Sequence, residues 1–182
     1  MRKLGHELGV EAMSLYNHVA NKDELLAGIR GLITEEIELP RDDDDWRAAL
    51  RRTALSAHEV LLRHRWAAGM WFRGGDEAEQ SMRMAEALLR ALREGGFSEE
   101  LAYHGYHAVQ AHIVGYSLYE VSFPLDASRL PQLAAEFLRD FPTEQYPYLA
   151  EHIEQHIDPP ASDTSTFEFG LDLLLDGFER LK

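Results

Sequence analysis

The sequence contains no cysteine among its 182 residues. This absence excludes disulfide bonds, thiolate metal ligands and a cysteine nucleophile, and it is compatible with a reducing cytosol. There is also no uninterrupted apolar run of about 18 residues and no signal-peptide pattern, so we expect a cytoplasmic protein without a membrane partner. GxSxG, HExxH, Walker and Rossmann motifs are missing as well, which argues against an enzyme.

Positive charge is scarce: 18 lysines and arginines face 32 acidic residues, and the net charge is −14. The imbalance is not uniform, because residues 1–30 hold four basic and four acidic side chains and the remaining 152 residues carry the whole excess. An acidic surface repels phosphates over a Debye length of roughly 8–10 Å. If the chain binds nucleic acid, we therefore expect residues 1–30 to make the contact.

Residues 3–26, KLGHELGVEAMSLYNHVANKDELL, carry the most specific pattern in the chain. Gly9 suits the left-handed backbone that ends a helix and reverses the chain. A second short helix is expected over 11–19, with Leu15 and Val19 turned inward at i, i+4. Asn21, with an acidic residue three positions later, is a typical helix start. Two short helices joined by a glycine turn predict a helix-turn-helix unit.

The stretch LGVEAMSLYNHVANKDELL is similar to the DNA-binding signature of the tetracycline repressor (TetR) family of bacterial regulators, whose pattern is LGV…LY.HV.NK..LL. This resemblance implies a transcriptional repressor that binds a palindromic double-stranded DNA operator as a homodimer. A small-molecule effector would release it. Family members place a further helix before this point, so residues 1–30 are expected to form a partial DNA-binding domain. The alternative is a small-molecule-binding helical dimer that lacks DNA-binding activity because of N-terminal truncation.

Apolar residues recur at helical spacing along the rest of the chain, and no useful strand pattern appears. We therefore predict an all-α fold in which residues 31–182 form a ligand-binding and dimerisation domain. The domain boundary is expected inside a helix that both domains share. After the helix-turn-helix unit, helices are expected over residues 21–39, 46–63, 64–75, 76–94, 98–122, 131–140, 146–156 and 165–182.

The resemblance also implies which side chains contact DNA. An arginine before the turn reaches a guanine edge, the second helix meets bases, and the following residues hold phosphates. Two of these side chains, Glu11 and Met13, could instead simply be solvated. The predicted DNA-binding residues are Arg2, Glu11, Ala12, Met13, Ser14, Tyr16, Asn17, His18 and Lys22.

A second resemblance concerns residues 31–182, which are called the body below. GFSEELAYHGYHAVQAHIVGYSLYE and FEFGLDLLLDGF resemble tetracycline-repressor-like C-terminal domains, which implies a small-molecule site in the helical body. Aromatic side chains with one polar tip suit a planar, partly polar ligand, although the same residues could be plain core. Positions carried over from the family are Thr53, Ala57, Trp71, Leu88, Tyr103, Tyr106 and Tyr119. Helical spacing adds His58, Met70, Met84, His107 and Gln110.

No metal or other cofactor is expected. In the tetracycline repressor a histidine coordinates the drug-bound magnesium, and the matching position here is Trp71, which implies a ligand recognised without metal. Two histidine pairs have spacings that suit metal ligands, but each lacks a third ligand nearby in sequence. These pairs are His104 with His107 and His152 with His156.

Two helices are candidates for the dimer interface, because the resemblance implies a bundle of two helices from each subunit. A dimer would place two recognition helices one DNA turn apart, roughly 34–36 Å. The alternative is that these apolar stripes belong to a monomer core. The predicted interface residues are Ala108, His112 and Gly115 in the first helix and Phe167, Leu171, Leu174, Phe178 and Leu181 in the second.

Overall fold

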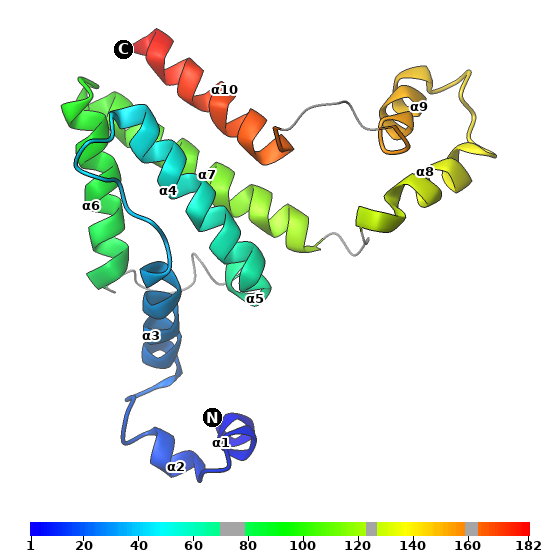
Figure 1. Ribbon diagram of the computed structural model, residues 1–182. Coiled ribbons are helices and arrows are strands. Elements are labelled where there is room, and N and C mark those ends of the chain that lie inside the picture. Colours follow the sequence, from blue (N-terminus) through cyan, green and yellow to red (C-terminus); the bar gives the residue numbers. More distant parts are fainter. Residues whose placement is uncertain (70–78, 123–126, 159–163) are drawn as a thin grey trace. The chain divides into compact units, whose positions relative to one another are not determined.

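The computed structural model describes residues 1–69, 79–122, 127–158 and 164–182, and every regular element in these ranges is a helix (Figure 1). The predicted all-α fold is confirmed. The elements are α1 (Arg2–Glu7), α2 (Ala12–Leu15), α3 (Lys22–Glu35), α4 (Trp46–Arg63), α5 (Arg65–Ala68), α6 (Glu79–Glu94), α7 (Glu99–Ser122), the 3-10 helix η1 (Ala127–Arg129), α8 (Leu130–Leu138), α9 (Pro147–Glu154) and α10 (Thr166–Leu181).

The chain divides into two compact units. The larger comprises Met1–Val121 with Phe167–Lys182, and the smaller comprises Ser122–Thr166. In the smaller unit α8 and α9 pack together, and each buries one alanine. A separate domain boundary at residue 30, as the sequence suggests, would fall inside α3 and stays a prediction.

The hydrophobic core of the larger unit comes from α4, α6, α7, α10 and the C-terminal part of α3. At one end, the rings of Trp46 and Phe97 meet edge to face with centroids 4.8 Å apart. Gly95 allows this packing, because a Cβ there would lie 2.6 Å from the Cβ of Trp46. Asp45 starts α4 by accepting a hydrogen bond of 2.8 Å from the backbone N–H of Ala48. These contacts fix where α4 enters the core.

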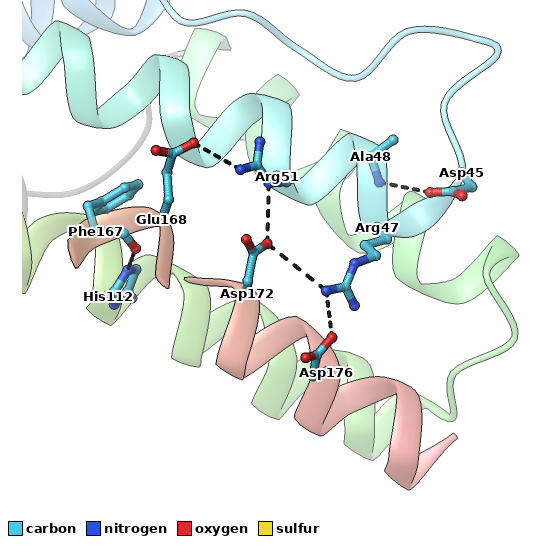
Figure 2. A network of polar contacts seen from close by, with 9 residues as sticks. All are labelled: Asp45, Arg47, Ala48, Arg51, His112, Phe167, Glu168, Asp172 and Asp176. Atoms are coloured by element: carbon cyan, nitrogen blue, oxygen red, sulfur yellow. Dashed lines mark hydrogen bonds and ion pairs between the residues drawn. The ribbon is translucent and has the colours of Figure 1, made fainter. Parts of the chain in front are cut away.

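A ladder of ion pairs joins α4 to α10 (Figure 2). The Arg51 guanidinium donates to Glu168 at 2.9 Å and to Asp172 at 3.2 Å. One turn earlier on α4, Arg47 donates to Asp176 at 2.6 Å and lies 4.0 Å from Asp172. Because the arginines are four residues apart and the carboxylates repeat every four residues, the ladder selects one register between the two helices.

The α3–α4 connection is held by local polar contacts. Asp44 accepts two hydrogen bonds of 2.9 Å from the Arg52 guanidinium and a third from the backbone N–H of Arg41. These bonds, the Arg52 bonds first, lower the pKa of Asp44 to about 2. The backbone N–H of Glu38 donates to Ser56 Oγ on α4 at 2.9 Å. The connection is therefore fastened to the outer side of α4.

Several predicted helix bounds need correction. The helix-turn-helix unit, residues 1–22, is called the head below. Its second helix ends at Leu15 instead of Val19, and hydrogen-bonded turns continue the chain to Val19. α3 ends at Glu35 instead of residue 39, although Ile37 is still buried in the core. The apolar periodicity misled the prediction here, because Ile37 packs from a turn that follows the helix. α4 has the predicted bounds.

Candidate functional site

The helix-turn-helix head depends on two glycines. Gly9 has φ of +69°, the left-handed conformation predicted for the turn. Gly5 is buried, and the backbone N–H of Val10 donates to its carbonyl oxygen at 2.9 Å. A Cβ on Gly5 would lie 2.7 Å from the Val10 carbonyl oxygen. Gly5 therefore allows the turn to pack directly on α1, a role that the sequence analysis missed.

The capping signal before α3 is confirmed. Asn21 Oδ1 accepts a hydrogen bond of 2.8 Å from the backbone N–H of Glu24. The Glu24 carboxylate accepts one of 2.5 Å from the backbone N–H of Ala20. This reciprocal pair resembles a capping box shifted by one residue. It ties the turn after α2 to α3 and places the exposed Lys22 at the first position of that helix.

The predicted DNA-binding residues are concentrated on this head. Arg2 opens α1, and Lys22 opens α3. Met13, in α2, has 73% of its surface exposed, and Tyr16, directly after it, has 44%. Of the nine residues, only Ala12 and Ser14 are half-buried, and the other seven are exposed. All nine thus lie within or next to α1, α2 and the start of α3.

The far end of α3 is tied to the body by two polar links. Both carboxylate oxygens of Glu36 are held from the end of α4, by Arg63 at 2.6 Å and by His64 Nε2 at 2.8 Å. The side-chain amide of Gln80 in α6 donates to Glu35 at 2.6 Å. α3 therefore carries the head at its start and contacts both α4 and α6 at its end.

The predicted ligand-binding residues that the structure describes fall into three groups by burial. Thr53, Ala57, Met84, Leu88 and Gln110 are buried in the body. His58 and Tyr106 are half-buried. Three others, Tyr103, His107 and Tyr119, are exposed on α7, and their contact with a ligand stays a prediction. Met70 and Trp71 lie outside the described residues.

Two buried polar atoms stand out in the first group. Thr53 Oγ1 and Gln110 Oε1 make no hydrogen bond to any residue that the structure describes. The amide nitrogen of Gln110 donates to the Tyr106 hydroxyl at 3.1 Å, so only the oxygen end of this side chain is unpaired. Buried polar atoms are seldom left without a partner, which makes these two positions candidates for ligand contact.

A histidine cluster lies beside the start of α10. His58 Nδ1 is 2.8 Å from Ser117 Oγ, and its Nε2 is 3.4 Å from the Glu120 carboxylate. The ring of His58 stacks on Phe167 with centroids 3.9 Å apart, and His112 Nε2 lies 2.9 Å from the Phe167 carbonyl oxygen. Burial lowers the pKa of His58, while the Glu120 charge opposes that shift. His58 is therefore kept neutral near pH 7.

The predicted dimer stripe on α10 is largely covered by its own chain. The side chains of Phe167, Leu171 and Phe178 are already buried in the core of their own chain. The exposed apolar side chains of α10 are Phe169, Leu173 and Leu181, at 59%, 54% and 69% exposure; of these Leu181 belongs to the predicted stripe, whose Leu174 is half-buried. Sequence periodicity detects both stripes, but only the body shows which one is covered.

Three further observations concern the described part of the chain. A hollow of about 380 Å³ lies over the outer face of α4, and none of the predicted ligand-binding residues lines it. In the part of the chain that the structure describes, no three histidine or acidic side chains come together as metal ligands would. No helix within the described ranges is long and apolar enough to cross a membrane.

A helix-turn-helix head joined by one helix to an all-helical body is the architecture of a DNA-binding regulator. The profile for the tetracyclin repressor-like C-terminal domain matches residues 39–181. The chain is 33% identical to the tetracycline repressor protein class G of Vibrio anguillarum, an alignment that covers 100% of this chain and 84% of that protein. The chain belongs to the TetR family of transcriptional regulators.

Solved structures support this family assignment. A possible TetR family regulator from Streptomyces coelicolor A3(2) is 28% identical with a TM-score of 0.79, covering 100% of this chain and 89% of that one. ActR from Streptomyces coelicolor, in complex with actinorhodin, is 25% identical with a TM-score of 0.75, covering 99% and 86%. The prediction of a ligand-responsive transcriptional repressor is confirmed, and the family consists of regulators that are not enzymes.

Proposed function

We propose that the protein is a cytoplasmic homodimer that binds a palindromic operator through residues 2–22 and leaves it when an effector enters the body. The observation that carries this proposal is the double attachment of α3. Its start holds the head, and its end is tied to α4 and α6. The alternative is a dimer without DNA-binding activity. It is not favoured, because the chain matches 84% of the length of a relative that is a repressor.

Each exposed side chain of the head has a role that suits its chemistry. The Arg2 guanidinium matches O6 and N7 of a guanine. Met13 offers only apolar contact, as to a thymine methyl group, and Tyr16 packs on a sugar or base edge. Lys22 stands at a helix start, where its charge and nearby backbone N–H groups favour a phosphate. Because the body is acidic, binding is confined to this head.

Release would follow from a shift between two conformations. An effector among α4, α6 and α7 that prefers one placement of these helices also selects a placement of α3, since Glu36 and Glu35 are held from α4 and α6. A differential affinity of a few kcal/mol between the two states is enough to empty an operator.

The dimer would form through the exposed face of α10 together with that of α7. Phe169, Leu173 and Leu181 provide the apolar stripe, and Leu118 and Tyr119 are the exposed apolar side chains near the end of α7. Leu173→Asp should produce monomers, because an unpaired carboxylate would be buried at the interface. Met82→Asp is a matched control, since Met82 is also 54% exposed but lies on α6. Light scattering that finds dimers of the Leu173 variant would contradict this interface.

The function is tested by selecting duplexes from a random DNA pool and then adding effectors. We expect a palindromic site with half-sites one turn apart. Tetracycline is the first effector to test, because relatives carry that name. If the ligand is recognised without metal, magnesium and a chelator should make no difference to release. Enrichment of no sequence from the pool would contradict the proposal.

A further inference from the structure

The two unpaired polar atoms of the body carry information about the effector. Thr53 has 0% and Gln110 7% of its surface exposed. A buried hydroxyl or carbonyl without a partner destabilises a protein, so a helical core would ordinarily place valine or leucine at such positions. The cost is offset when a ligand supplies the missing hydrogen bonds.

Both residues lie along the same pair of helices. α4 begins beside Phe97, two residues before the start of α7, where the rings of Trp46 and Phe97 meet, and it contacts α7 itself further along, where His58 meets Ser117. Thr53 lies between those two contact points on α4, and Gln110 lies between them on α7. Each unpaired atom therefore lies on a segment of α4 or α7 that is bounded by these two contacts.

The direction of the missing hydrogen bonds follows from the neighbours. Because the Gln110 amide nitrogen is engaged by Tyr106, the free end is a carbonyl oxygen, which accepts and never donates. A ligand must therefore donate to it. The Thr53 hydroxyl can accept or donate, so a ligand hydroxyl satisfies it as well. An anionic group would face the Gln110 oxygen and an acidic body, both of which disfavour negative charge.

We infer that the effector is an uncharged, hydroxyl-bearing aromatic compound that donates a hydrogen bond to Gln110 Oε1 and shares another with the Thr53 hydroxyl. This inference rests on the proposed function, since it assigns the chemical class of effector to the same site. Aromatic rings suit the apolar surroundings that Ala57, Met84 and Leu88 provide in the core.

The melting temperature of the ligand-free protein provides the first test, and Thr34 serves as a matched control. Thr34 is also a buried helical threonine, but its hydroxyl donates to the Arg30 carbonyl oxygen at 2.9 Å. Thr34→Val removes a satisfied bond and should lower the melting temperature. Thr53→Val removes an unpaired hydroxyl and should leave the melting temperature unchanged or raise it. A fall as large as that of the Thr34 variant overturns the inference.

The second test is calorimetry on the full chain with three ligands. They are a naphthalenediol, its dimethyl ether and the matching naphthalene dicarboxylate. The diol should bind about tenfold more tightly than the ether, which has the same shape but no donor, and more tightly than the dicarboxylate. Thr53→Val and Gln110→Met should weaken diol binding about three- to tenfold and leave ether binding unchanged. Thr34→Val should bind the diol like the wild type.

Failure to bind the diol, or equal binding of the ether or the dicarboxylate, overturns the assigned class. The selection of operator DNA separates this failure from failure of the proposed function, because it depends on the head and needs no ligand. A protein that selects a palindrome but prefers the ether keeps its proposed function and loses this inference.

Discussion

The head and the body of this protein are stabilised in different ways. In α1 and α2 the one buried residue is Gly5, and Leu8 in the turn between them is 60% exposed. The body buries large side chains from five helices and adds the ion-pair ladder between α4 and α10 (Figure 2). The head therefore depends on backbone hydrogen bonds and caps, and the body on apolar burial.

The largest effect of this difference is expected in the rates of amide hydrogen exchange. We expect amide hydrogens of α1 and α2 to exchange several orders of magnitude faster than those of α4 and α7, because local opening of the head exposes little apolar surface. Mass spectrometry after exchange in heavy water measures both regions in one sample. Equal protection of the two regions would remove the distinction.

A substitution at Gly5 should disable the head and spare the body. Gly5→Ala places a methyl group 2.7 Å from the Val10 carbonyl oxygen, so the turn must move. We expect operator affinity to fall by roughly a hundredfold with an unchanged melting temperature, since about 1–3 kcal/mol of strain is large beside the few contacts of the head. Gly28→Ala, where a Cβ meets open space on α3, is the control and should retain binding.

Two charge deletions sharpen the assignment of roles within the head. Arg2→Ala should relax base preference at one position, at a cost of about 1–3 kcal/mol for the preferred sequence. Lys22→Ala should weaken binding to all sequences and reduce the salt slope by about 1. Titrations against selected and random duplexes at several salt concentrations distinguish the two. Identical effects on both duplexes from both variants would contradict the roles.

The reverse experiment weakens the body and spares the head. Arg51→Met removes two bonds of the α4–α10 ladder and should lower stability by about 1 kcal/mol, because these pairs are only partly shielded from water. Arg41→Met is the control, since the Arg41 side chain is mostly exposed and its guanidinium lies 3.7 Å from the Glu38 carboxylate. Chemical denaturation measures both. A smaller loss for Arg51 than for Arg41 would show that the ladder contributes little.

The smallest expected effect is a pH dependence of the body. Burial holds the folded-state pKa of His58 below its ordinary value of 6.5. The unfolded chain then binds the proton more readily, so stability should decline as pH falls through 6.5 and should be flat above it. The nearby charges are Glu120, Glu59 and, when protonated, His112. His58→Gln should remove this part of the slope in thermal melts, whereas the exposed His104→Gln should not.

Much of the fold followed from the sequence. Asn21 with Glu24 and Gly9 are local signals, and each element they mark is present. Local signals succeed because caps and turns depend on a few adjacent residues. The function followed from the dense signature in residues 8–26, which resembles a family that the comparisons then established.

The candidate site was less predictable. Periodicity placed Phe167 and Leu171 on an apolar stripe, but it could not decide whether the partner or the chain's own core covers that stripe. It likewise could not separate the buried Gln110 from the exposed Tyr103 on α7. A helix of mixed apolar faces fits several orientations, and only packing against its neighbours selects one.

The sequence by itself determined that the chain is helical and where most helices begin. It also determined that residues 1–30 have no net charge while the rest of the chain is acidic. These properties depend only on residue type and short spacing. Only the tertiary structure decided the close approach at Gly5, the register between α4 and α10, and the lack of a partner for Thr53 and Gln110 among the residues described. The α4–α10 register arises between segments far apart in the chain, and the Gly5 approach depends on how the turn folds back on α1, so no residue pattern records which atoms meet.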